Sequence, residues 1–198
     1  MVRREHRRQK DRRTMSRAVS CLDLCRTARV ISPRANVNGV PHDPLRHVMD
    51  VCADPAEALA LSIIRFLAAG YTTGDVACWD AAYSGAEHLL GPVSGGRLVA
   101  SLTALVQALR AERGGAWTFM PVACCRVTVD EQAIIDLIGA ARTGDNPAIG
   151  RAAAALALRD DAPAIAAAAQ HAATIIDDVA VVLPVRIGAH HVRPTRLH

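Results

Sequence analysis

The sequence predicts an all-α fold: a compact bundle of about six short helices with an extended connector before the fourth helix. Apolar residues make up 51% of the 198 residues but aromatic residues only 3%, so the core must consist of Ala, Leu, Ile and Val. Such a composition favours helices, and aromatic-poor chains are rarely all-β. From Asp54 onward, apolar residues also recur every three or four positions between helix start and stop signals.

The charge of the chain is unevenly distributed. Residues 1–48 contain 12 Arg and Lys against 4 Asp and Glu, a net charge of +8, whereas residues 49–198 contain 11 against 15, a net charge of −4. A mildly acidic body binds nucleic acid poorly. Binding to nucleic acid is therefore expected only if the basic N-terminal region is a real part of the protein.

Three regions are predicted from this pattern. Residues 1–48 lack a helical period and are rich in arginine and turn-forming residues, which indicates either a disordered basic arm or a spurious extension upstream of a true start at Met49 or Met15. Residues 49–183 form the helical domain. Residues 184–198 are expected to be a flexible basic tail.

The first helix is predicted to begin after Asp54 and to end at Gly70. Asp54 suits the N-cap, Pro55 the first helical position and Glu57 the capping-box position, while Gly70 is a natural stop. The residues expected to face the core share one broad stripe: Ala56, Leu59, Ala60, Ile63, Ile64, Phe66 and Leu67.

The second and third helices are predicted on either side of the Gly-Pro pair at 91–92. Thr72 is expected to cap the second helix, with Asp75 three residues later, and the Ser-Gly pair at 84–85 weakens its middle. Its apolar stripe is Val76, Trp79, Tyr83, Ala86 and Leu90. The stripe of the third helix is Leu98, Leu102, Leu105 and Leu109, and Gly114-Gly115 ends it.

A connector and three more helices complete the pattern. Residues 116–127 contain a proline and no helical period, which predicts an extended segment. The fourth helix begins at Thr128, whose partner Glu131 completes a capping box. The fifth is expected from Asn146-Pro147 and the sixth from residues 161–163. Their expected core residues are Ile134, Ile135, Ile138, Ala141, Ile149, Ala153, Leu156, Ile165, Ala169, Ala172, Ile176 and Val179.

The cysteines are expected to be reduced thiols of a cytoplasmic protein. No apolar segment of the kind found in a signal peptide follows the arginines, and no run of 18 apolar residues predicts a membrane-spanning helix. Disulfides are rare in reducing compartments. The six are Cys21, Cys25, Cys52, Cys78, Cys124 and Cys125.

Cys124 and Cys125 are the only candidates for a metal or redox site. Adjacent side chains in an extended chain point to opposite sides, so the pair is a poor start for a zinc site, and a disulfide between them would be strained. Their place before a helix N-terminus, next to Arg126, favours a reactive thiolate. The alternative is that both are small hydrophobic residues of the connector.

Other chemistry-bearing residues have structural interpretations. The Cys21-x₃-Cys25 spacing lacks a second ligand pair, and Asp130-Glu131 lies where carboxylates stabilise a helix start. Asp177-Asp178 is expected to be a solvated edge, and His88 and His171 to be packing or surface residues. No catalytic triad, glycine-rich cofactor loop or metal motif is present, so no catalytic residue and no cofactor are predicted.

The segment "MPVACCRVTVDEQAIIDLIGAARTGD", preceded by "IIRFLAAGYTTGDVACWDAAY", resembles a family of small uncharacterised helical proteins from alphaproteobacteria. The shared pattern is a proline, a short cysteine cluster and T-x-D-E at the start of an aliphatic helix. The resemblance covers roughly residues 55 to 180 and implies a small all-helical domain with no known activity. It matches the family's cysteines to Cys124 and Cys125.

The leading functional hypothesis is a non-enzymatic cytoplasmic protein that acts through contacts with a protein partner or by self-association. Two alternatives stay open. The first is a metal- or thiol-dependent protein that uses Cys124 and Cys125. The second is a regulator that uses the arginine-rich N-terminal arm on nucleic acid.

Overall fold

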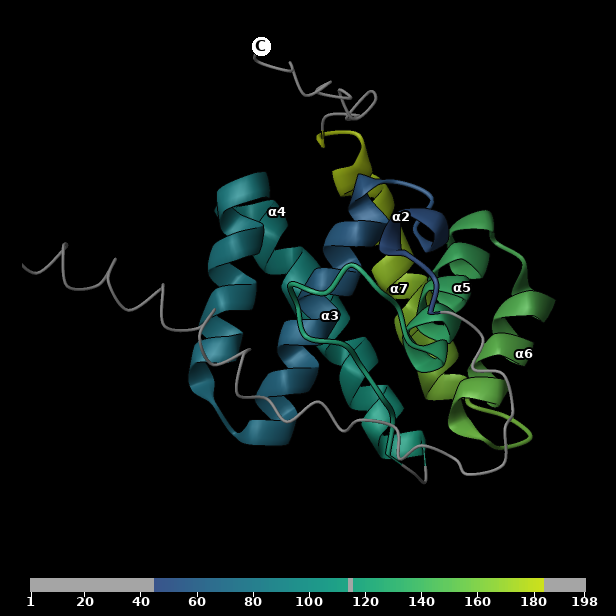
Figure 1. Ribbon diagram of the computed structural model, residues 1–198. Coiled ribbons are helices and arrows are strands. Elements are labelled where there is room, and N and C mark those ends of the chain that lie inside the picture. Colours follow the sequence, from purple (N-terminus) through teal and green to yellow (C-terminus); the bar gives the residue numbers. More distant parts are fainter. Residues whose placement is uncertain (1–44, 114–115, 184–198) are drawn as a thin grey trace, which may run out of the picture.

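The computed structural model describes residues 45–113 and 116–183 as an all-α bundle, as the sequence predicts. Residues 1–44 of the expected arm, with Cys21 and Cys25, and the expected tail lie outside these residues. Six helices and no strand are found in the described part of the chain (Figure 1): α2 (Val48–Val51), α3 (Pro55–Thr73), α4 (Val76–Glu112), α5 (Val129–Thr143), α6 (Asn146–Ala157) and α7 (Pro163–Ala180).

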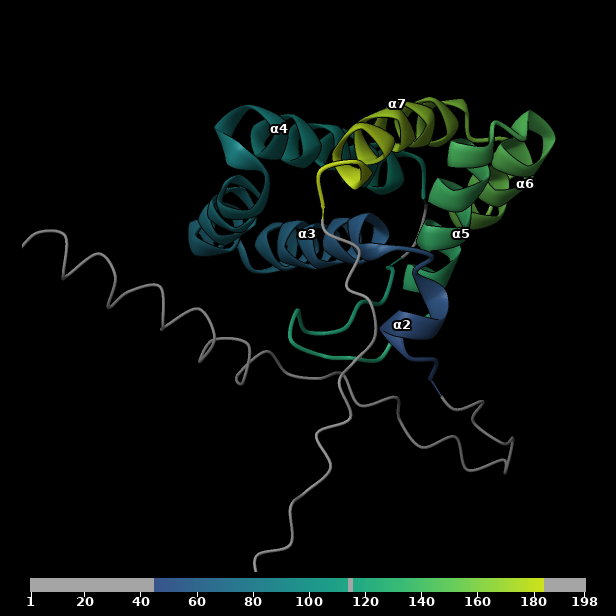
Figure 2. The ribbon, with the colours of Figure 1, turned by 90° about the horizontal axis from the view of Figure 1, so that it is seen from above.

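The helices pack around one aliphatic core. Helix α3 packs against α4 and α7, α4 also packs against α7, and α5 packs against α6 and α7. Viewed from above, α3 lies on one side of the bundle and the second part of α4 lies with α7 on the other (Figure 2). The predicted stripe of the third helix is fully buried there, since Leu98, Leu102, Leu105 and Leu109 are at most 2% exposed.

Helix α4 contains the second and third predicted helices, joined by a break at the predicted place. Gly91 has non-helical torsion angles (φ 79°, ψ 165°), and Pro92 follows it as the first residue of the second segment. We call residues 76–90 and 92–112 the first and second segments of α4. The helix continues through the Ser-Gly pair at 84–85, so the predicted weakness there produces no break.

The two segments of α4 meet at Gly95. A Cβ atom added to Gly95 would lie 2.6 Å from the backbone carbon of Ala86 and 2.6 Å from the backbone nitrogen of Glu87. Any side chain would therefore collide with main chain that has little freedom to move. Glycine at this position is what allows the second segment to approach the first.

The predicted junction between the first two helices is wrong in detail. Helix α3 continues past Gly70 to Thr73 and ends at Gly74, which has a left-handed conformation (φ 70°). Thr72 belongs to α3, and Asp75 is the N-cap of α4 instead. Gly70 is needed for packing, because a Cβ there would lie 2.5 Å from Nε1 of Trp79.

Some predicted faces and ends also differ. Val76 and Tyr83 are exposed, while Ala82 and Ala86 form the buried face of the first α4 segment. Helix α6 is capped by Asp145, one residue before the predicted cap, and it ends at Ala157 because Leu158 takes a left-handed conformation. The other predicted core residues of α5 to α7 are buried except Ala141, which is partly buried.

Helix α7 receives its N-terminal cap from a residue far away in the sequence. Its own N-cap residue, Ala162, has no side chain that can accept a hydrogen bond. The carboxylate of Glu112, at the end of α4, accepts hydrogen bonds from the backbone N–H groups of Ala164 (3.3 Å) and Ile165 (3.0 Å). Negative charge at a helix N-terminus is favourable, so Glu112 joins the end of α4 to the start of α7.

By length and composition alone, α4 is the one described helix that could cross a membrane. Its second segment contributes the buried leucine stripe of the bundle core, and its backbone is broken at Gly91. The expectation that the protein binds no membrane stays a prediction.

Candidate functional site

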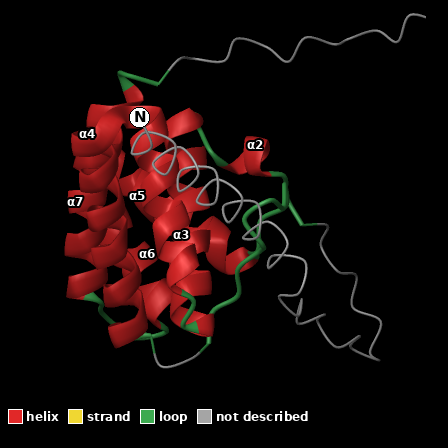
Figure 3. Ribbon diagram, turned by 90° about the vertical axis from the view of Figure 1, so that its left-hand side faces the viewer, coloured by secondary structure: helices red, strands yellow, loops and turns green. Residues whose placement is uncertain are grey.

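The connector of residues 116–127 crosses one face of the bundle and is the most distinctive feature of the structure. It lies with α2 on the side of α3 and α5 that faces away from α7 (Figures 2 and 3). Residues 116–125 contain no charged side chain, and none of them is fully buried. No helix forms within residues 116–127, which confirms the predicted connector before the fourth helix, and a turn at 122–123 and a bend at Cys125 lie within it.

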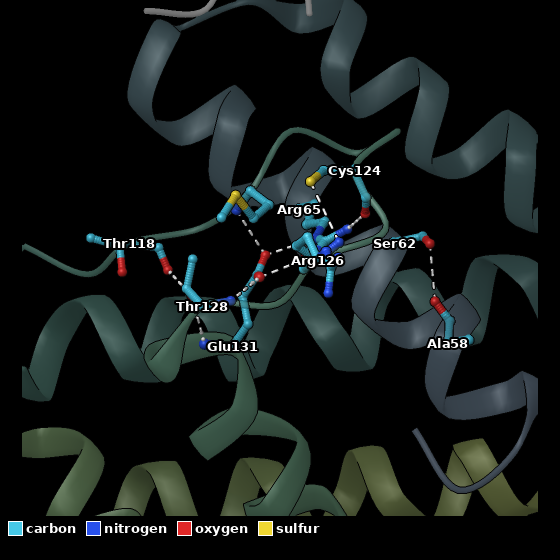
Figure 4. Close-up of polar contacts among 9 residues, drawn as sticks. Ala58, Ser62, Arg65, Thr118, Cys124, Arg126, Thr128 and Glu131 are labelled. Atoms are coloured by element: carbon cyan, nitrogen blue, oxygen red, sulfur yellow. Dashed lines mark hydrogen bonds and ion pairs between the residues drawn. The ribbon is translucent and has the colours of Figure 1, made fainter. Parts of the chain in front are cut away.

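A buried ion pair lies beneath the connector. Arg65, in the middle of α3, is 2% exposed, and Glu131, in the first turn of α5, is fully buried. Arg65 Nε lies 2.7 Å from Glu131 Oε1, and Arg65 Nη2 lies 3.0 Å from Glu131 Oε2. Paired hydrogen bonds of this kind fix both distance and orientation (Figure 4).

The remaining bonds of the pair hold the connector backbone. Arg65 donates to the carbonyl oxygens of Cys124 (2.6 Å) and Arg126, while Glu131 accepts from the N–H groups of Met120 (2.9 Å) and Thr128 (2.9 Å). Both charged groups are thus supplied with hydrogen bonds, as burial requires. We call this arrangement the connector clamp.

The capping box of α5 is part of the clamp. Thr128 Oγ1 accepts from the backbone N–H of Glu131, and Glu131 accepts from that of Thr128, as the T-x-x-E motif predicts. The motif does not reveal that the same carboxylate binds Arg65. The sequence does contain one indication of this pair. Arg65 is the one charged residue between Glu57 and Asp75, and a lone arginine among the apolar residues of a core helix needs a buried partner.

A second carboxylate holds the first part of the connector. Asp130 accepts hydrogen bonds from the backbone N–H (2.6 Å) and hydroxyl (2.9 Å) of Thr118 and pairs with Arg113 at 2.9 Å. Partial burial acts to raise the pKa of Asp130, but these hydrogen bonds and the charge of Arg113 outweigh it and hold the pKa below its ordinary value. Asp130 and Glu131 therefore have structural partners, in agreement with the sequence interpretation.

Acid should weaken this attachment. Because the folded pKa of Asp130 is below the unfolded value, its contribution to stability is present above the unfolded value of 3.8 and is lost as pH falls through the folded value. We expect Asp130→Asn to lower the free energy of unfolding by about 1 kcal/mol near neutral pH. When chemical denaturation is measured at a series of pH values, the free energy of unfolding of Asp130→Asn should fall less steeply below about pH 4 than that of the wild type.

The exposed Asp136→Asn change in the same helix is the matched control and should leave the wild-type pH profile unchanged. If the Asp130→Asn profile also ran parallel to that of the wild type at every pH, the assigned role of Asp130 would be wrong.

Residues before the expected domain boundary also hold the connector. His47 and Arg126 form an antiparallel bridge, in which Val48 N–H donates to the carbonyl of Cys125 (2.9 Å) and Val127 N–H donates to that of Arg46 (3.0 Å). The expected boundary between residues 48 and 49 thus lies within α2. Residues 45–48 belong with the folded domain.

Cys124 and Cys125 both lie on the connector. Cys124 is partly buried and Cys125 is exposed, and both are free thiols. The sulfur of Cys124 accepts a hydrogen bond from the backbone N–H of Arg126 at 3.4 Å. Within residues 45–113 and 116–183, no group of three or more His, Cys, Asp or Glu side chains is placed to hold a metal ion.

A second ionic cluster joins α3, α5 and α7. Arg142 lies 2.7 Å from carboxylate oxygens of Asp54, Glu57 and Asp177. Burial opposes its charge, but hydrogen bonds to the three carboxylates raise the pKa of Arg142 overall. The cluster is an inter-helix tie, and Asp177 is a member of it rather than only a solvated edge.

The other candidate residues are at the surface. His88 and His171 are exposed. Asp178 is exposed and lies 3.5 Å from Arg97.

Comparisons with protein-family models, curated proteins and solved structures find nothing that matches this chain. The resemblance to the helical alphaproteobacterial family therefore stays a prediction.

Proposed function

We propose that this chain is a non-enzymatic cytoplasmic protein that acts through protein contacts, and that the outer edge of its connector mediates self-association. The observation that carries the proposal is an uncharged, partly exposed edge of backbone whose inner side is held to the bundle by hydrogen bonds. Natural proteins usually protect such edges with charged residues or cover them. Residues 116–125 have no such charge.

The inner hydrogen bonds define which groups face outward. The N–H and C=O groups of Thr118 bond to Asp130 and to the hydroxyl of Thr128, and the N–H of Met120 bonds to Glu131. Backbone groups alternate between the two sides of an extended chain. Those of Trp117 and Phe119 therefore face away from the bundle, and within the described residues they make no hydrogen bond.

This edge is complementary to itself. If two copies paired in an antiparallel manner about a twofold axis at Thr118, Trp117 of one copy would lie opposite Phe119 of the other, and the two would exchange hydrogen bonds. Trp117 and Phe119 already contact each other, with ring centroids 5.9 Å apart. The paired edge would thus contain four aromatic rings, which are favourable cross-strand neighbours.

The test is the molar mass of the protein in solution across a wide concentration series. We expect a dimer for the wild type and a monomer for Phe119→Lys, because a lysine charge on the edge opposes strand pairing. Val181→Lys, at an apolar position that is 88% exposed outside the connector, is the control and should remain dimeric.

A monomeric wild type at every concentration, or a dimeric Phe119→Lys, would contradict self-association through this edge. Circular dichroism of each variant checks that the helices persist, and Trp117→Ser provides a second edge variant if Phe119→Lys fails to fold. The alternative role of the arginine-rich arm on nucleic acid concerns residues outside the described part of the chain. Filter binding with and without residues 1–44 tests it separately.

A further inference from the structure

Two cysteines that are adjacent in sequence lie in the part of the connector whose backbone is bonded to both α3 and α2. Cys125 is exposed and Cys124 partly buried, and the backbone bends at Cys125 after a turn in which Cys124 N–H donates to the carbonyl of Pro121 (2.8 Å). Neighbouring side chains of an extended chain point to opposite sides. Because the backbone bends here, that rule does not apply to the two cysteines. Because the cysteines are adjacent in sequence, their Cα atoms stay about 3.8 Å apart in any conformation of the connector.

The carbonyl groups of the same two residues carry structural hydrogen bonds. Cys124 O accepts from Arg65 Nη1 at 2.6 Å, which is one of the bonds of the connector clamp (Figure 4). Cys125 O accepts from the N–H of Val48 at 2.9 Å, which holds the start of α2 against the connector. The Cys124 carbonyl lies in the peptide between the two cysteines, and the Cys125 carbonyl lies in the next peptide. A change in the backbone angles of the pair would therefore affect both the clamp and the hydrogen bond to α2.

We propose that Cys124 and Cys125 are a thiol–disulfide exchange site that takes a small disulfide such as oxidised glutathione. The Cys125 thiolate attacks one sulfur of the small disulfide, forms a mixed disulfide and releases one thiolate. The Cys124 thiolate then attacks the Cys125 sulfur and expels the second thiolate. One protein disulfide forms, the small disulfide is reduced to two thiols, and the two protons of the cysteines pass to the released thiolates.

The geometry makes this reaction a reversible switch. Cα atoms of neighbouring residues are about 3.8 Å apart, below the usual 4.4–6.8 Å of a disulfide, so ring closure must twist the connecting peptide. Strained, exposed disulfides are the readily reduced ones that serve regulation. The connecting peptide contains the Cys124 carbonyl, which ring closure turns away from Arg65. Closure also changes φ of Cys125 and so displaces the Cys125 carbonyl from Val48, which weakens one of the two backbone hydrogen bonds between the start of α2 and the connector.

The experiment uses the full chain treated with oxidised glutathione under native conditions. Cleavage after Arg113 and Arg126 isolates both cysteines in one peptide. We expect this peptide to lose two hydrogens without carrying a glutathionyl group. Hydrogen exchange at the amide of Val48 should rise by roughly tenfold, the effect of losing one net hydrogen bond, and dithiothreitol should reverse it.

Two further thiol measurements make the result specific. In Cys124→Ser, the reaction should stop at the mixed disulfide, so the peptide should carry one glutathionyl group and the Val48 amide should keep its slow exchange. Cys52 should stay unmodified, because burial, with the nearby charge of Glu57, raises the pKa of its thiol to about 12.

Three outcomes would overturn the proposal: a peptide that keeps both thiols reduced, a Cys125 linked to a second chain in place of Cys124, or an internal disulfide that leaves Val48 exchange unchanged. The proposal is independent of self-association through Trp117 and Phe119, since a monomeric protein can still form the internal disulfide.

Discussion

Replacing Glu131 by glutamine should destabilise the fold by about 3–5 kcal/mol, because it leaves the charge of Arg65 buried without a counter-charge. Arg65 is 2% exposed and cannot turn to solvent without opening the contact between α3 and the connector. Denaturant unfolding measures the loss directly. Hydrogen exchange should show faster exchange at the Met120 and Thr128 amides, which bond to the same carboxylate.

The matched control is Glu87→Gln, the same chemical change at an exposed position of α4, which should shift stability by no more than about 0.5 kcal/mol. A second variant separates charge from packing. Arg65→Met combined with Glu131→Leu should be more stable than Glu131→Gln alone, because no unpaired buried charge remains. A Glu131→Gln protein as stable as the wild type would show that the ion pair does not hold the connector.

Replacing Gly95 by alanine should cost about 2–3 kcal/mol, although alanine is the better helix former. The added Cβ would lie 2.6 Å from backbone atoms of Ala86 and Glu87. Relief requires the two segments of α4 to separate, which exposes part of the core. The midpoint of denaturant unfolding is the measurement.

The neighbouring glycine is a close control. A Cβ on Gly96 would meet no atom within 4 Å, so Gly96→Ala should stabilise the protein by roughly 0.5–1 kcal/mol through helix propensity. The two alanine substitutions should change the free energy of unfolding in opposite directions only if Gly95 is a packing contact. Equal gains at both positions would contradict the close approach of the two segments.

The sequence predicted the helices well where a local signal was sufficient. The leucine stripe of 98–109, the capping box at Thr128 and the break at 91–92 depend on spacing within one or two helical turns, and the structure confirms all three. The prediction that Gly70 ends its helix is wrong, because Gly70 instead makes room for the ring of Trp79. A glycine with that role and a glycine that ends a helix cannot be told apart in the sequence.

The connector site could be predicted only in part. The proline, the lack of a helical period and the carboxylates at 130–131 indicated an extended segment followed by a capped helix. Arg65 is 66 positions away from Glu131 in sequence, and nothing local indicates that the two side chains meet. Long-range ion pairs depend on how helices are arranged, and the sequence pattern gives the helices without that arrangement.

The cap that Glu112 provides to α7 has a consequence for how the chain tolerates change. It brings the end of α4 to the beginning of α7. The connector, α5 and α6, which lie between them in the chain, therefore form a closed loop whose two ends meet at Glu112. The entropy of closing a loop grows only slowly with its length. Extra residues inserted at Gly144, between α5 and α6, or near Asp160, between α6 and α7, both exposed, should therefore cost little. Cutting the chain beside Glu112 would open this closed loop and leave the connector clamp and the Arg142 cluster to hold α5 against the bundle.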